Sequence, residues 1–142
     1  MAKPEALRLL AEDAEDLAII SAALQDALVR IGDIAFDGPS RRLTVACNRY
    51  RWEGDARKER VRSGLQLGGV MSVQSRNLRR DAKAAVIELL AVTFEPGEAP
   101  GGAVVFTFAG GGDLRAEVEC LDLVLADVSP PWTARRAPAH DS

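Results

Sequence analysis

The sequence is short of the residues on which most catalytic and metal sites are built. Its 142 residues contain one histidine, His140, and two cysteines, Cys47 and Cys120. A Ser-His-Asp or Cys-His arrangement would need this single histidine as its base, and it lies in a small, polar C-terminal stretch. No HExxH motif, paired-cysteine motif or EF-hand loop occurs. The sequence therefore predicts no catalytic residue, no metal site and no cofactor.

Long apolar runs are lacking as well. No segment approaches the ~20 apolar residues of a membrane span, and the first 30 residues have no secretory signal pattern. The two cysteines lie far apart in apolar surroundings, which favours two buried, reduced thiols over a disulfide. These absences predict a cytoplasmic protein that does not associate with membranes.

What the chain does contain is typical of one globular domain. Hydrophobic residues make up 47% and charged residues 27% of it, well away from the disordered class. We therefore treat residues 1–142 as a single domain, with residues 1–12 flexible and residues 133–142 a disordered tail.

The charges are unevenly distributed. Residues 41–83 hold twelve Lys or Arg against four acids, whereas the rest of the chain holds six against seventeen. This asymmetry is typical either of a basic face for an anionic partner or of two parts of one fold that complement each other. The sequence favours the second interpretation without excluding the first.

An amphipathic helix is predicted over about residues 14 to 30. Asp13 is placed to cap it, while Glu15 and Asp16 put negative charge at the positive end of its dipole. Its apolar residues recur at three- and four-residue steps and so form one stripe. They are Leu17, Ile20, Leu24, Ala27, Leu28 and Ile31. Its acidic opposite face is expected to be solvated.

From there the hydrophobic period changes to two. A hairpin is predicted around the turn at residues 37–40, because Leu43, Val45 and Cys47 alternate with more polar neighbours. More strands are predicted at residues 61–67, 70–74, 85–95, 103–109 and 114–118. The apolar run 85–95 fits the periods of both a helix and a strand, and its β-branched residues favour a strand. A second helix is predicted from the spacing of Leu121, Val124, Leu125 and Val128, and Pro130-Pro131 would end it.

These elements predict an α+β fold that is mostly β. About seven antiparallel strands would form a bent sheet or partly closed barrel, with an N-terminal amphipathic helix and a C-terminal helix that caps the open end. This order of elements resembles a pleckstrin-homology-like barrel with an extra N-terminal helix. A fold of this kind does not determine function.

The triplet Gly110-Gly111-Gly112 raises the question of a phosphate-binding loop. A P-loop needs a Lys-Ser/Thr pair and a helix after its glycines, but here Asp113, Leu114 and Arg115 follow with a period of two. The pattern therefore predicts a β-hairpin turn. Nearby, Glu117 and Glu119 are two residues apart on one strand, and we interpret them as a solvated face rather than an acid/base pair.

The basic, aromatic stretch around residues 48–62 is the strongest candidate for a binding surface. Arginines contact phosphates and aromatic rings stack on bases, and both residue types also anchor protein interfaces. A structural interpretation of the same stretch is also open. On a strand, Tyr50 and Trp52 share one face, so they would pack on the core while Arg49 and Arg51 face water. The candidate binding residues are Arg49, Tyr50, Arg51, Trp52, Arg60, Arg62 and Trp132.

Four blocks of sequence carry a resemblance to a known family. They are EDLAIISAALQDA, NRYRWE, LLAVTFEP and FAGGGDLRAEVECLDLVLADVSPPW, within about residues 7–140. Together they resemble the alphaproteobacterial family called domain of unknown function 2948. The resemblance implies a cytosolic bacterial protein and transfers no functional residue, since the family has no established activity.

The resulting hypothesis is a non-enzymatic protein-interaction or accessory module. Its partner is expected to be a protein, and a homo-oligomer is an open alternative. The second hypothesis is an anion or nucleic-acid binder that uses the basic segment 41–83, although a pI near 5.2 argues against a dedicated nucleic-acid protein.

Overall fold

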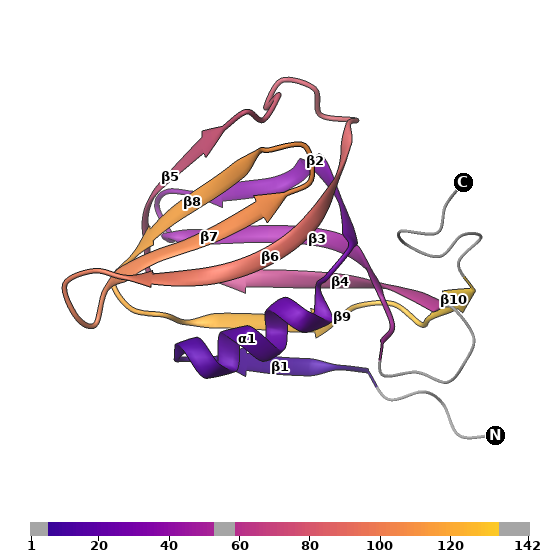
Figure 1. The fold of residues 1–142 in the computed structure, drawn as a ribbon, viewed down its shortest axis with the longest axis horizontal. Coiled ribbons are helices and arrows are strands. Elements are labelled where there is room, and N and C mark those ends of the chain that lie inside the picture. Colours follow the sequence, from indigo (N-terminus) through magenta and orange to yellow (C-terminus); the bar gives the residue numbers. More distant parts are fainter. Residues whose placement is uncertain (1–5, 53–58, 134–142) are drawn as a thin grey trace.

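The computed structural model describes residues 6–52 and 59–133, and in this part of the chain it contains one helix and ten strands (Figure 1). The helix is α1 (Ala14–Ala23). The strands are β1 (Arg8–Ala11), β2 (Ala27–Asp37), β3 (Arg42–Tyr50), β4 (Glu59–Leu67), β5 (Val70–Arg76), β6 (Val86–Pro96), β7 (Gly102–Phe108), β8 (Asp113–Val118), β9 (Leu123–Asp127) and β10 (Trp132–Thr133).

All the strand pairs are antiparallel and belong to one sheet. The hydrogen-bonded order is β1-β9-β4-β3-β2-β6-β7-β8-β5, and β10 pairs with β4. The sheet bends so that β5, β8, β7 and β6 face the strands β2, β3, β4 and β9 (Figure 1). Strands on both sides of the bend bury side chains in a single apolar cluster, which includes Val45, Leu65 and Leu125 from one side and Val92, Phe106 and Leu114 from the other.

The prediction of a mostly β, antiparallel fold is confirmed, but the sheet is open rather than a closed barrel. Its path ends at β1 and β5, which do not pair with each other. Ten strands occur in the described residues, not about seven. Residues 8–11, which belong to the stretch predicted as flexible, form β1 beside β9. Residues 134–142 lie outside the described part.

The predicted C-terminal helix is wrong, because β9 occupies its place. Leu121, Leu123 and Leu125 are buried at every second position, and β9 pairs with both β1 and β4. A short apolar run fits either period, and in this case the two neighbouring strands favour the extended form. The resemblance to a pleckstrin-homology-like barrel depended on that capping helix and loses its support.

The N-terminal helix is confirmed at its start and wrong at its end. Asp13 caps it, its Oδ1 atom accepting a hydrogen bond from the Asp16 amide at 2.8 Å. The helix ends at Ala23, with Leu24 as its C-cap, and Asp26 then takes a positive φ of 64°. From Ala27 the chain continues as β2, whose inward positions Ala27, Val29 and Ile31 are buried.

Helix α1 lies against the part of β6 that β2 leaves without a strand neighbour. β2 pairs with β6 only at residues 86–89. Beyond that point the Val92 amide donates to Ser21 Oγ of the helix at 2.9 Å. Leu17 and Ile20 pack into the core from the same helix. The helix therefore covers the inner cluster where the sheet is open, between β6 and β1 (Figure 1).

The glycine triplet forms the predicted hairpin between β7 and β8. The Phe108 amide donates to the Gly112 carbonyl at 2.9 Å. Gly110 and Gly111 have φ values of 89° and 92°, in the region that only glycine enters readily. The turn is a reversal of the chain, as its sequence predicts.

Candidate binding surface

The predicted binding residues lie on neighbouring strands at one end of the sheet. Arg49 and Tyr50 end β3, Arg60 and Arg62 lie on β4, and Trp132 begins β10. In the register of these strands Tyr50 lies opposite Arg60, and Arg60 lies opposite Trp132. Residues that face each other across antiparallel strands share one face of the sheet. The structure therefore brings Tyr50, Arg60 and Trp132 into one cross-strand row.

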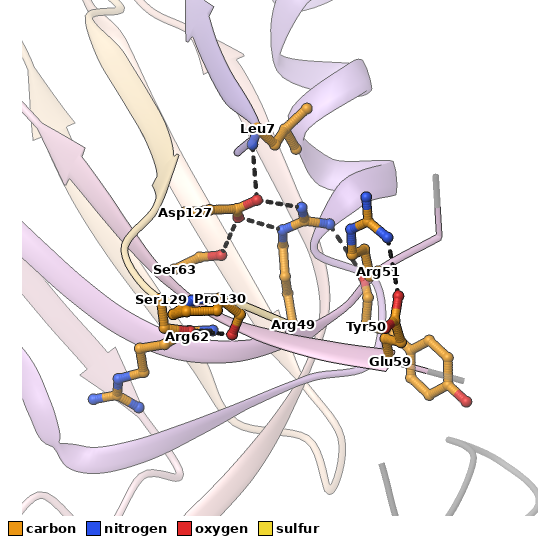
Figure 2. Close-up of polar contacts among 10 residues, drawn as sticks. All are labelled: Leu7, Arg49, Tyr50, Arg51, Glu59, Arg62, Ser63, Asp127, Ser129 and Pro130. Atoms are coloured by element: carbon orange, nitrogen blue, oxygen red, sulfur yellow. Dashed lines mark hydrogen bonds and ion pairs between the residues drawn. The ribbon is translucent and has the colours of Figure 1, made fainter. Parts of the chain in front are cut away.

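Arg49 is not part of that row, because it points into the protein. It is fully buried, and its guanidinium makes a bidentate ion pair with Asp127, with Nε–Oδ1 and Nη2–Oδ2 distances of 2.9 Å (Figure 2). Asp127 also accepts hydrogen bonds from Ser63 Oγ at 2.7 Å and from the Leu7 amide at 2.8 Å. These contacts place Arg49 in a structural cluster, so the expectation that its side chain faces water is wrong.

The environment of Asp127 keeps its carboxylate charged. Burial raises the pKa of this group, but hydrogen bonds from Arg49, Ser63 and the Leu7 amide act in the opposite direction. The result is a pKa below the ordinary value. Asp127, which belongs to β9, is thereby linked to β3, to β4 and to Leu7, the residue before β1.

Arg51 and Arg62 are also paired with carboxylates. Arg51 Nη1 lies 3.0 Å from Glu59 Oε1, and both side chains are largely buried. Arg62 Nη2 lies 2.9 Å from Asp33 Oδ2, and its Nη1 donates to Asn48 Oδ1 at 3.2 Å. Both guanidinium groups are thus already engaged within the domain.

Tyr50, Trp52, Arg60 and Trp132 form what we call the aromatic–arginine cluster. The rings of Tyr50 and Trp52 stack with their centroids 4.9 Å apart, and the Arg60 guanidinium carbon lies 5.1 Å from the Tyr50 ring centre. Trp52 Nε1 also donates to the Gln25 carbonyl at 3.3 Å. Trp52 and Trp132 remain 49% and 41% exposed, so they present the cluster to solvent.

The basic segment 41–83 is largely neutralised by acids within the fold. Ion pairs join Arg41 to Glu119, Arg49 to Asp127, Arg51 to Glu59, Arg62 to Asp33, Arg76 to Asp113 and Arg79 to Asp81. Four of the six acids come from outside the segment. The basic segment and the acidic remainder of the chain therefore neutralise each other in large part within the domain. Arg57 and Lys58 lie outside the described residues.

The other candidate groups are engaged in ion pairs or lie outside the described part. Glu117 and Glu119 are each paired with an arginine, Arg115 and Arg41 respectively. No cluster of three or more potential metal ligands occurs in residues 6–52 and 59–133. No helix of the described chain has the length and apolarity to cross a membrane. His140 is outside the described residues.

The two cysteines differ in exposure, which corrects the expectation that both are buried. Both thiols are free, Cys47 in the core and Cys120 at the surface. Burial raises the pKa of Cys47 to about 12, outweighing the nearby charges of Arg62 and Arg49. Since the thiolate is the reactive form, Cys47 is expected to be inert in the folded protein.

Thiol labelling tests this difference. At about pH 8, dithiobis-nitrobenzoate should modify about one thiol per chain in the folded protein and about two after denaturation. The variant Cys120→Ser should show no rapid labelling until it unfolds. Rapid modification of the folded Cys120→Ser protein would contradict the prediction.

The comparison with protein families identifies the chain. Residues 7–140 match the family described as protein of unknown function (DUF2948). The chain belongs to this family. The match covers β1 to β10 and includes the whole aromatic–arginine cluster. No curated protein and no solved structure matches the chain significantly. Membership in DUF2948 thus supports the sequence resemblance and brings no activity with it.

No local sequence pattern predicts the acidic partners that decide the roles of the arginines. Asp127 lies 78 positions from Arg49 and Asp33 lies 29 positions from Arg62, so no local pattern links either acid to its arginine. One signal was present: Leu43, Val45 and Cys47 face the core, so the period of two places Arg49 on the same buried face. A buried arginine on a strand requires a carboxylate nearby.

Proposed function

We propose that this DUF2948 domain is a non-enzymatic protein-interaction or accessory module, and that the aromatic–arginine cluster is its contact surface. The observation that carries the proposal is the row Tyr50-Arg60-Trp132, with Trp52 stacked beside it. Tryptophan, tyrosine and arginine are the residues most enriched among interface anchors. Trp52 and Trp132 are exposed at one end of the sheet, whereas Tyr50 and Arg60 are buried beside them, so a protein partner would contact the two tryptophan rings.

The fixed positions of the side chains in the aromatic–arginine cluster also support this proposal. Stacking, the cation–π contact and the Trp52 hydrogen bond hold these long side chains in place before a partner binds. Binding then immobilises fewer free rotamers, which favours affinity. The alternative, an anion or nucleic-acid binder through segment 41–83, draws less support because Arg49, Arg51 and Arg62 are engaged with Asp127, Glu59 and Asp33.

Substitution of the two exposed tryptophans tests the proposal. Trp52→Ala and Trp132→Ala should each weaken binding of a captured protein partner about tenfold or more, as expected for anchor residues. Leu10→Ala removes a similarly exposed apolar side chain from β1 and serves as the matched control. Affinity capture with quantitative mass spectrometry finds the partner, and titration with the purified partner measures its affinity.

The outcomes separate the candidate roles. Loss of binding in the tryptophan variants but not in Leu10→Ala supports the proposal. A homodimer in light scattering that the tryptophan variants dissociate supports it with a second copy as the partner. Binding that all three variants retain overturns it, as does a monomer for which no captured protein depends on either tryptophan.

A further inference from the structure

Strand β5 is the terminal strand of the sheet and has one free edge. It pairs with β8 over residues 70–76 and with no other described strand. It lies on the opposite side of the molecule from β10 (Figure 1). An edge strand carries a row of backbone groups that can pair with another chain.

The register shows which backbone groups of β5 point away from the sheet. The Phe108 amide donates to the Gly112 carbonyl, so these two residues form a hydrogen-bonded pair of the β7–β8 ladder. Hydrogen-bonded pairs recur at every second residue, so the backbone groups of Leu114 and Ala116 also bond to β7. The residues between them bond toward β5, where Gln74 lies opposite Arg115. On β5 itself, the residues on either side of Gln74 must then direct their amides and carbonyls outward. They are Val73 and Ser75.

The free edge lacks the usual protection against pairing. Natural edge strands carry lysine, proline or inward-pointing charges, or they bulge along the edge. The sequence of β5, VMSVQSR, has neither lysine nor proline, and its register irregularity lies near its start, between Val70 and Ser72. Its one charge, Arg76, lies at the end and is bound to Asp113 of β8 at 2.6 Å. The middle of the edge is uncharged and regular.

Unpaired bases occur in the chain segments that adjoin the two ends of this strand. At its start the Val70 amide donates to the Arg41 carbonyl at 2.9 Å, which places the Arg41 backbone beside the strand, and Arg42 is the next residue. Arg80 and Lys83 follow its end in the loop that leads to β6. Within the described chain these exposed bases, Arg42, Arg80 and Lys83, make no ion pair, whereas Arg41 and Arg79 do.

We propose that the free edge of β5 binds an extended, acidic segment of a partner polypeptide as an added strand. The outward backbone groups of Val73 and Ser75 would pair with the segment, as in other strand-addition complexes. Carboxylates at the two ends of the segment would meet Arg42 at one end and Arg80 with Lys83 at the other. A strand of seven residues spans about 23 Å at about 3.3 Å per residue, which sets the spacing of the acidic ends.

A synthetic peptide probes this edge directly. A fluorescein-labelled peptide of about nine residues, with alternating threonine and valine between paired glutamates at each end, matches the length of the strand. Fluorescence anisotropy should detect saturable binding that weakens as salt increases. The same peptide with lysine in place of glutamate should not bind. A peptide N-methylated at alternate residues should also lose binding, because it cannot complete the ladder.

Variants of β5 and its flanks separate strand pairing from charge. Ser75→Pro removes an outward amide without removing a bond to β8, and it should weaken binding about tenfold or more. Its matched control, Ser75→Ala, keeps the amide and should bind within about twofold of wild type. Arg80→Glu combined with Lys83→Glu should also lose binding, whereas Arg8→Glu on β1 should not.

Three results would overturn the proposal. The first is equal binding of the N-methylated peptide, which would make strand pairing irrelevant even if Ser75→Pro fails to fold. The second is equal competition by a single-stranded oligonucleotide of the same charge, which would indicate a general anion surface. The third is a dimer that Ser75→Pro dissociates, without peptide binding, which would make a second copy the occupant of the edge.

Discussion

Replacing Asp127 by alanine is expected to lower the free energy of unfolding by about 3 to 5 kcal/mol. The substitution leaves the guanidinium of Arg49, which is fully buried, without its bidentate carboxylate partner. It also removes the acceptor for the Ser63 hydroxyl and the Leu7 amide. Urea denaturation followed by tryptophan fluorescence measures the loss.

The control is an ion pair at the surface. Glu119→Ala removes the partner of Arg41, and both side chains of this pair are more than half exposed. Water solvates what remains, so a change of less than about 1 kcal/mol is expected. Equal losses in Asp127→Ala and Glu119→Ala would contradict the special role of the buried cluster. A double variant, Arg49→Met with Asp127→Leu, should recover part of the stability because no buried charge is left.

The pH dependence of stability gives a second measurement of the same cluster. Folding lowers the pKa of Asp127 below its ordinary value of 3.8. A carboxyl group with a depressed pKa stabilises the folded state above its unfolded pKa, and this contribution is lost as the pH falls through the folded pKa. The stability difference between wild type and Asp127→Asn should therefore be full above about pH 5 and should shrink below about pH 4.

Local sequence patterns predict the hairpins in the middle of the chain, whereas pairing with distant strands determines the structure of segments nearer its two ends. The hairpins formed by β2 with β3 and by β7 with β8 carry their own turn residues and alternation, so the sequence identifies them. The segments at residues 24–31 and 121–128 have apolar spacings that fit both a helix and a strand. Pairing with β6 in the first case, and with β1 and β4 in the second, makes them strands.

The sequence predicts which residue types make up the candidate site, but it does not predict which of them are buried in structural contacts and which are exposed. From the sequence, Arg49, Tyr50 and Arg60 belong to one candidate binding surface, because they lie close together in the chain and are residue types that often contact partners. In the fold, the period of two sends Arg49 inward to Asp127, while Tyr50 and Arg60 lie opposite each other. This division depends on contacts between residues 78 positions apart, which no local pattern contains.

Gly112→Ala is expected to destabilise the protein by about 2 kcal/mol, although Gly110 and Gly111 are the glycines of the triplet with positive φ. A Cβ atom at Gly112 would collide with the Leu78 side chain and would lie 3.0 Å from the Asn77 carbonyl oxygen. The third glycine is thus needed for close approach of the loop after β5, whereas the first two are needed for the turn itself.

A double-mutant cycle isolates this contact. Leu78→Ala should cost stability alone but should relieve the collision in the double variant, giving a coupling energy of about 1 kcal/mol. Gly38→Ala is the matched control, because no heavy atom lies within 4 Å of its added Cβ. It should change stability by less than about 0.5 kcal/mol. Strictly additive effects of Gly112→Ala and Leu78→Ala would show that the hairpin, rather than packing against Leu78, requires glycine at this position.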